Sequence, residues 1–155
     1  MPYGYCALPR WQDIDLTNDK PVLAAGAVQI VGAEMTKITN EFDALCRLAE
    51  QAYNEDQAVS FESTLIDILI FVKNNQSARN ELVEEFKSLL SSGNGPFEAV
   101  AFCMHELRWP EIQDFAIARM NTSTDPRSEA LRSLVLAYDD DWPDADLYAY
   151  YASAQ

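Results

Sequence analysis

The most apolar run of this sequence reads Leu65-Ile66-Asp67-Ile68-Leu69-Ile70-Phe71-Val72. Its β-branched residues would allow a strand, because isoleucine and valine are enriched in β-sheets. The run belongs, however, to a longer apolar segment at residues 57–73, and strands are usually shorter than that. The segments on either side also have helical spacing. We therefore expect a buried helix at the centre of the fold.

Helical spacing continues in both directions from this run. Apolar side chains recur every three or four residues, as on one face of an α-helix, in residues 34–53, 78–90, 97–107, 112–120 and 131–138. Asp125-Pro126 is typical of a helix start, and Pro143 opens a last segment that runs to Ala152. No segment alternates as a half-buried strand does. The sequence therefore predicts an all-α fold of about seven helices, stacked as helical hairpins.

The chain is expected to form a single domain over residues 1–155. Residues 1–20 contain proline and glycine without periodicity, which predicts an irregular N-terminal arm, and residues 34–153 form the helical body. Between them, residues 21–33 are apolar but follow acids rather than the basic region of a signal peptide. They are also too few to span a bilayer. We expect a buried helix or strand at this point.

The charge of the chain limits its partners. It has 25 acidic and 11 basic residues, for a formal charge of −14. Nucleic acids and anionic membranes are bound by clustered Lys and Arg, so the balance argues against both as partners. A basic protein is compatible with it, and so is a charge that only maintains solubility.

Residues that carry catalysis or bind cofactors are few. Cys6, Cys46 and Cys103 form no closely spaced pair, which indicates a reducing cytoplasm and neither a zinc site nor a disulfide framework. His105 is the sole histidine, and two residues of separation put it and Cys103 on different sides of a helix. No nucleophile elbow, metalloprotease motif or phosphate loop is present. We expect no enzymatic activity, no cofactor and no metal.

An acidic stretch near the end of the chain reads Asp139-Asp140-Asp141-Trp142-Pro143-Asp144-Ala145-Asp146-Leu147-Tyr148. A calcium loop of the EF-hand type fails in every register that starts at its first three acids, because Trp, Pro or Tyr falls at a ligand position. A D-D-x-x-D pattern, as in prenyl and terpene synthases, is interrupted by proline in a chain too short for that fold. The positive end of a helix dipole accounts for acids beside Pro143, but not for Asp139 and Asp140.

Two segments of the sequence resemble each other. Trp109-Pro110-Glu111-Ile112-Gln113-Asp114-Phe115 and Trp142-Pro143-Asp144-Ala145-Asp146-Leu147-Tyr148 share a tryptophan, a proline, an acid and a later aromatic residue. The tryptophans are 33 positions apart, the length of a helical-hairpin repeat. Stacked repeats of this kind would give a short α-solenoid with a concave face. The alternative is two unrelated helices that both begin with Trp-Pro.

With Phe102-Cys103-Met104-His105-Glu106-Leu107-Arg108-Trp109-Pro110-Glu111-Ile112 and the segment from Tyr138 to Tyr148, the chain resembles the HEAT-like immunity proteins of bacterial polymorphic and contact-dependent growth-inhibition toxin systems. The likeness covers residues 96–148. It implies a short HEAT-like solenoid and a non-enzymatic, cytoplasmic antidote that binds and blocks a cognate toxin domain.

The acidic surface fits that function, because a toxin domain that attacks nucleic acid usually has a basic cleft. The predicted toxin-binding residues are Asp139, Asp140, Asp141, Trp142, Asp144, Asp146, Tyr148, Glu111 and Asp114. We expect the five aspartates to be mostly exposed, without a base to offset them. An alternative for Trp142 and Tyr148 is that they close the last layer of the core. The alternative function is an α-solenoid adaptor that binds a host protein or peptide.

Overall fold

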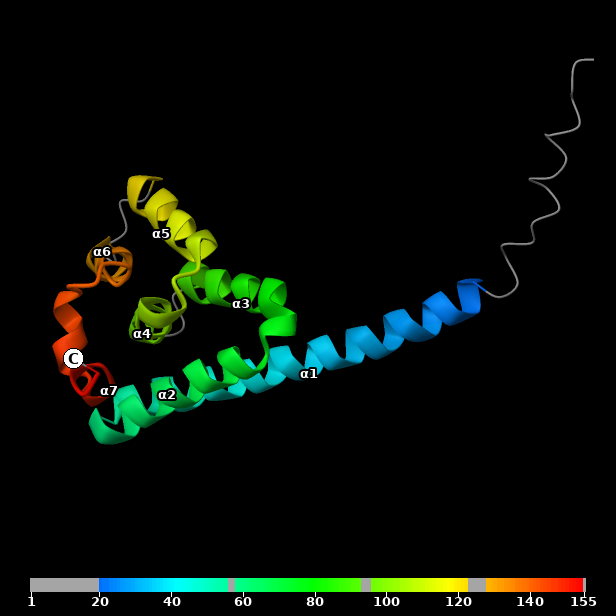
Figure 1. Ribbon diagram of the computed structural model, residues 1–155, viewed down its shortest axis with the longest axis horizontal. Coiled ribbons are helices and arrows are strands. Elements are labelled where there is room, and N and C mark those ends of the chain that lie inside the picture. Colours follow the sequence, from blue (N-terminus) through cyan, green and yellow to red (C-terminus); the bar gives the residue numbers. More distant parts are fainter. Residues whose placement is uncertain (1–19, 56–57, 93–95, 123–127, 155) are drawn as a thin grey trace, which may run out of the picture. The chain divides into compact units, whose positions relative to one another are not determined.

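A computed structural model describes residues 20–55, 58–92, 96–122 and 128–154 (Figure 1). These residues form seven α-helices and two short 3-10 helices, with no strand among them. The helices are α1 (Lys20–Asn54), α2 (Ala58–Asn74), η3 (Gln76–Ala78), α3 (Arg79–Ser92), α4 (Phe97–Leu107), α5 (Pro110–Thr122), α6 (Ser128–Leu136), η4 (Pro143–Leu147) and α7 (Ala149–Ala152). The prediction of an all-α fold of about seven helices is confirmed.

By its contacts the chain divides into two units, residues 1–36 and residues 37–155. In the first unit, the described residues are the beginning of α1. Residues 21–33, predicted as a helix or a strand, are part of this helix, which therefore begins well before the predicted residue 34. The predicted irregular arm lies outside the described residues apart from Lys20. Asp125 and Pro126, the predicted helix start, also lie outside them.

The run that suggested the fold is helical, as predicted. Leu65, Ile68, Leu69 and Val72 are fully buried, a spacing of three and four residues that puts them on one face of α2. Ile70, by contrast, is 50% exposed. The buried face of α2 therefore contains only some residues of the apolar run. Burial of this face stabilises the helix and outweighs the preference of its isoleucines for β-strands.

The central helix of the second unit is α4 rather than α2, which corrects the prediction. All six residues from Ala99 to Met104 are buried, so α4 is covered on every side. Figure 1 shows α4 in the middle of this unit, with α2, α3, α6 and α7 around it. Small side chains at Ala99, Ala101 and Cys103 allow neighbouring helices to approach closely, while Phe102 and Met104 fill the space between them.

The segment after Pro143 was predicted as one helix to Ala152, but it forms two short ones. Tyr148 separates η4 from α7 with an extended backbone, φ −113° and ψ 122°. This break turns the ring of Tyr148 toward α4, where its centroid lies 5.0 Å from that of Phe102. The rings of Tyr150 and Tyr151 also pack on Phe102. Aromatic packing on α4 thus outweighs helical continuity here.

Hydrogen bonds fasten α7 to the helices beneath it. Glu62 of α2 accepts the backbone N–H of Tyr150 at 2.8 Å, and the Tyr151 hydroxyl donates to the carbonyl of Phe102. The Tyr150 hydroxyl donates to Glu106 at 2.9 Å, and Glu106 also pairs with Lys73. The C-terminal segment is therefore joined to both α2 and α4.

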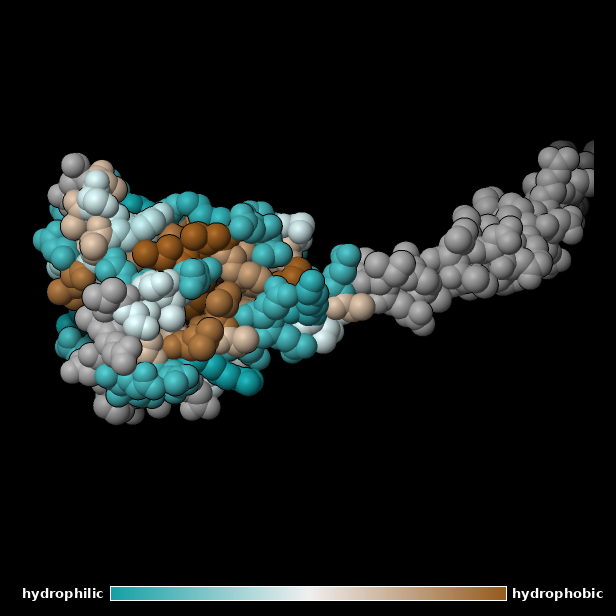
Figure 2. Space-filling model, turned by 90° about the horizontal axis from the view of Figure 1, so that it is seen from below, coloured by the Kyte–Doolittle hydropathy of each residue, from teal (hydrophilic) through white to brown (hydrophobic). Residues whose placement is uncertain are grey.

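The face presented by α1 and α2 carries hydrophobic areas among hydrophilic ones (Figure 2). On these two helices, the large hydrophobic side chains that remain about half exposed are Leu48, Tyr53 and Ile70. Among the described residues, no helix is both long and apolar enough to cross a membrane.

We predict that Leu69→Asp lowers the free energy of unfolding by about 3–5 kcal/mol or prevents folding, because it buries a carboxylate without a partner. Leu69 is 1% exposed. Its neighbour Ile70 gives a matched control, since Ile70→Asp makes the same charge change at a half-exposed position and should cost less than about 1 kcal/mol. Urea denaturation measures both. Equal losses for the two variants would contradict the buried face described for α2.

Candidate functional site

The two Trp-Pro segments share the structure of their first turn. Trp109 and Trp142 are both buried and precede a proline that begins a helix. The carbonyl of Trp109 accepts the N–H of Ile112 at 3.2 Å, and that of Trp142 accepts the N–H of Ala145 at 3.1 Å. Beyond this turn the likeness ends, because α5 is an α-helix of 13 residues and η4 a 3-10 helix of five.

In the first segment, Glu111 is already paired. Its carboxylate accepts two hydrogen bonds from the Arg79 guanidinium, at 2.6 and 2.8 Å, and that guanidinium also lies over the Trp109 ring. These bonds lower the pKa of Glu111 to about 2. Asp114, by contrast, is exposed. The predicted toxin contacts of this segment therefore differ: Glu111 joins α5 to α3, whereas Asp114 is available to a partner.

In the second segment, four of the five aspartates are exposed, as predicted: Asp139, Asp140, Asp141 and Asp146. Asp144 is half-buried and accepts a hydrogen bond from the Ser133 hydroxyl. The expectation that no base offsets these acids is wrong for Asp140, which pairs with Arg108 at 2.8 Å. Arg108 lies 32 positions earlier, so local sequence did not reveal the pair.

Arg108 combines an unusual backbone conformation with side-chain bonds to the acidic residues after α6. It ends α4 in the left-handed conformation, φ 54° and ψ 38°, which usually favours glycine. Its guanidinium donates to the carbonyls of His105 and Tyr138 and to Asp140. An unusual backbone conformation is thus held by a side chain that joins the end of α4 to the turn after α6.

Trp142 and Tyr148 belong to the core, which confirms the alternative interpretation of these two aromatics. Trp142 is 4% exposed, and its ring centroid lies 5.0 Å from that of His105 and 5.9 Å from that of Tyr148. His105 Nδ1 lies 2.7 Å from the carbonyl oxygen of Ala137, so this nitrogen must carry the proton and donate. His105 is therefore a packed residue that connects α4 to the end of α6.

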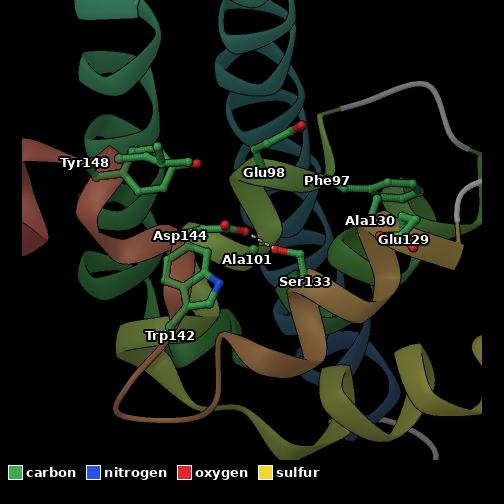
Figure 3. A pocket seen from close by; sticks show the side chains of 10 residues that line it. Phe97, Glu98, Ala101, Glu129, Ala130, Ser133, Trp142, Asp144 and Tyr148 are labelled. Atoms are coloured by element: carbon green, nitrogen blue, oxygen red, sulfur yellow. Dashed lines mark hydrogen bonds between the residues drawn. The ribbon is translucent and has the colours of Figure 1, made fainter.

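Both aromatic residues nevertheless have an edge on a pocket of about 330 Å³ between α4, α6 and η4 (Figure 3). Its lining, hereafter the Trp142 pocket, consists of Phe97, Glu98, Ala101, Glu129, Ala130, Ser133, Trp142, Asp144, Leu147 and Tyr148. The hydrogen bond between Ser133 and Asp144 crosses it from α6 to η4. Nothing in the local sequence marks Phe97, Glu98, Glu129 or Ser133 as lining residues, because no local motif joins residues from separate helices.

The charge of the Trp142 pocket is negative. Glu98, Glu129 and Asp144 line it, and the described residues of its lining include no Lys or Arg. Burial raises the pKa of the Tyr148 hydroxyl well above its ordinary value, and the carboxylates of Glu98 and Asp144 raise this pKa further. Both acids therefore lie close enough for their field to act within the pocket.

One buried polar atom of this pocket lacks a hydrogen-bond partner among the described residues. The indole nitrogen of Trp142 is buried, and among the described residues it has no hydrogen-bond partner. Figure 3 shows this nitrogen on the side of the ring that is turned toward Ser133 and Asp144. A buried donor without an acceptor is unfavourable, by roughly 1–3 kcal/mol. The arrangement therefore suits a ligand that brings an acceptor.

The cysteines within the described residues are unsuited to nucleophilic chemistry. Burial raises the pKa of the Cys46 thiol to about 12 and that of Cys103 well above its ordinary value. Both thiols therefore stay protonated at neutral pH. Over the ranges that the structure describes, no group of three or more His, Cys, Asp or Glu side chains could hold a metal ion.

Comparison with protein-family models, with curated proteins and with solved structures found no match to this chain. The features of this chain that bear on its function are its exposed aspartates after α6 and the Trp142 pocket.

We predict that Glu111→Gln removes a stabilising contribution that depends on pH. The carboxylate of Glu111 has a pKa of about 2 in the folded protein, below its ordinary value of 4.5, so its ion pair stabilises the fold above pH 4.5 and ceases to do so as the pH falls toward 2. The difference in melting temperature between wild type and Glu111→Gln should therefore be largest above pH 4.5 and vanish near pH 2.

The matched control for this prediction is Asp114→Asn, an exposed acid on the same helix. Its melting curve should follow the wild type across the same pH range. A constant offset for Glu111→Gln at every pH would show that the pair with Arg79 does not form in solution.

Proposed function

We propose that this protein is an immunity protein, which binds a basic toxin domain and blocks it without any chemistry of its own. The observation that carries the proposal is the acidic turn, residues 139–146, which runs from the end of α6 into η4. Asp139, Asp141 and Asp146 are exposed there, and among the described residues none of these carboxylates has a hydrogen bond or an ion pair. The excess of 25 acids over 11 bases extends this negative field to the whole chain.

Such a surface attracts a basic partner before contact is made. Uncompensated charges of one sign speed the encounter with an oppositely charged protein by roughly 10- to 1000-fold at low salt. A toxin domain that cleaves nucleic acid needs a basic cleft to hold its substrate. An inhibitor that covers this cleft would therefore be acidic, in agreement with the likeness to HEAT-like immunity proteins.

The acidic turn is also held rigidly, which favours tight binding. Trp142 anchors it in the core, Arg108 joins Asp140 to the end of α4, and Ser133 holds Asp144. A surface that is ordered before binding loses less conformational entropy when the complex forms. This supports a function in binding a folded protein partner rather than in simple solubility.

The proposal predicts that co-expression with its toxin protects a growing cell. A toxin domain encoded directly upstream of this gene should stop growth when expressed alone and permit growth when this protein is present. The two proteins should then copurify as a complex. Continued growth arrest despite equal expression would contradict the proposal, and copurification without protection would favour the adaptor function instead.

We further predict that the triple variant Asp139→Asn, Asp141→Asn, Asp146→Asn associates with the toxin domain more slowly and with a weaker dependence on salt. Its stability should change little, because exposed charges contribute little to it. The control is Glu34→Gln, Glu50→Gln, Asp67→Asn, which makes the same change in charge at exposed positions of α1 and α2. Stopped-flow association at several ionic strengths measures both. Equal rates for the two triple variants would show that the acidic turn does not direct binding.

A further inference from the structure

We infer that the Trp142 pocket binds an arginine or lysine residue of a polypeptide, through the guanidinium or ammonium group of its side chain and a carbonyl oxygen of its backbone. The carboxylates of Asp144 and Glu98 attract the cation, and the indole N–H of Trp142 donates to the carbonyl oxygen. The inference deepens the proposed function by naming the group that the partner inserts. It rests on that function only for the identity of the partner.

The cationic half follows from the lining of the pocket. Asp144 uses one oxygen, Oδ2, to accept from Ser133, and its other oxygen has no partner among the described residues. Glu98 is half-buried on the facing helix, α4. A positive group between them gains charge-assisted hydrogen bonds, which are the stronger kind. The rings of Phe97 and Tyr148 also line the pocket and would cover the apolar stem of a basic side chain.

The carbonyl half follows from Trp142. An indole nitrogen can only donate, so a guanidinium or ammonium group alone cannot satisfy it. The nitrogen is closed to water in this structure, so an acceptor reaches it through a small shift of the pocket lining and then removes the cost of the unpaired donor. A ligand that satisfies both halves must combine a cation with an acceptor, and every basic residue in a peptide chain has this combination.

The size and rim of the pocket agree with a single side chain. A volume of about 330 Å³ lies at the small end of the usual range for ligand pockets. Leu147 lines it and is 75% exposed, the highest exposure of any large hydrophobic side chain in the described part of the chain. This leucine offers the peptide chain next to the inserted residue an apolar contact outside the pocket.

The test uses three small probes and does not require the toxin. They are Nα-acetyl-arginine N-methylamide, which has both features, n-butylguanidinium, which has the guanidinium without the carbonyl, and Nα-acetyl-norleucine N-methylamide, which lacks the cation. Each is titrated into ¹⁵N-labelled protein while the indole N–H signals are followed. Trp142→Phe identifies the Trp142 signal by its loss and keeps an aromatic ring in the core.

The arginine probe should shift the Trp142 indole proton downfield and saturate at millimolar concentration. n-Butylguanidinium should bind more weakly without this downfield shift, and the norleucine probe should not saturate. Asp144→Asn should weaken binding of the arginine probe about tenfold, the loss expected for one charge-assisted hydrogen bond. Asp67→Asn is the matched control, because Asp67 is an exposed acid of α2 outside the pocket lining and should leave the affinity unchanged.

Other outcomes overturn the inference. Equal binding of n-butylguanidinium with no indole shift would make the pocket a site for free cations, and equal losses in the two aspartate variants would reduce binding to surface charge. No saturable shift with any probe would mean that the pocket binds no such group. Saturable binding together with failed protection from the toxin would leave the pocket intact and remove the proposed function, so the two failures are distinguishable.

Discussion

The burial of α4 on all sides is the constraint on which the rest of this structure depends. The middle of this helix, Ala99–Met104, has no polar face and must be covered completely, and here the cover comes from helices both before and after it in sequence. Ala99, Ala101 and Cys103 set how closely these helices approach. Phe102 then fixes where the last aromatic residues pack, and through them the position of η4 and the acidic turn.

This dependence connects the core to the candidate site. The same Trp142 ring packs against His105 and carries, at the pocket, a donor that has no partner among the described residues. Arg108 ends the central helix and holds Asp140 at the surface. The negative surface is therefore presented by side chains whose backbone is fixed by core packing, which is the condition for a preorganised binding surface.

The fold class was predictable because spacing of three and four residues is local and repeats in every segment. The sequence did not reveal which helix is central, because Leu65–Val72 is more apolar than α4. Whether a helix lies at the centre depends on how many other helices pack around it. The acids at Asp139–Asp146 were correctly expected to be mostly exposed. The pair between Arg108 and Asp140, the pair between Arg79 and Glu111 and the lining of the Trp142 pocket join separate helices, and nothing in a single sequence brings such residues together.

The hydrogen bond from the Tyr150 N–H to Glu62 spans 88 positions in sequence and bears on how the protein is made. During synthesis α2 and α4 are made before Tyr148, Tyr150 and Tyr151. Until those rings arrive, the Phe102 side of α4 has nothing to cover it. The nascent chain thus exposes an apolar surface of α4 until residues 148–151 have emerged, so this side of the core is completed only after the segment that follows η4 has been made.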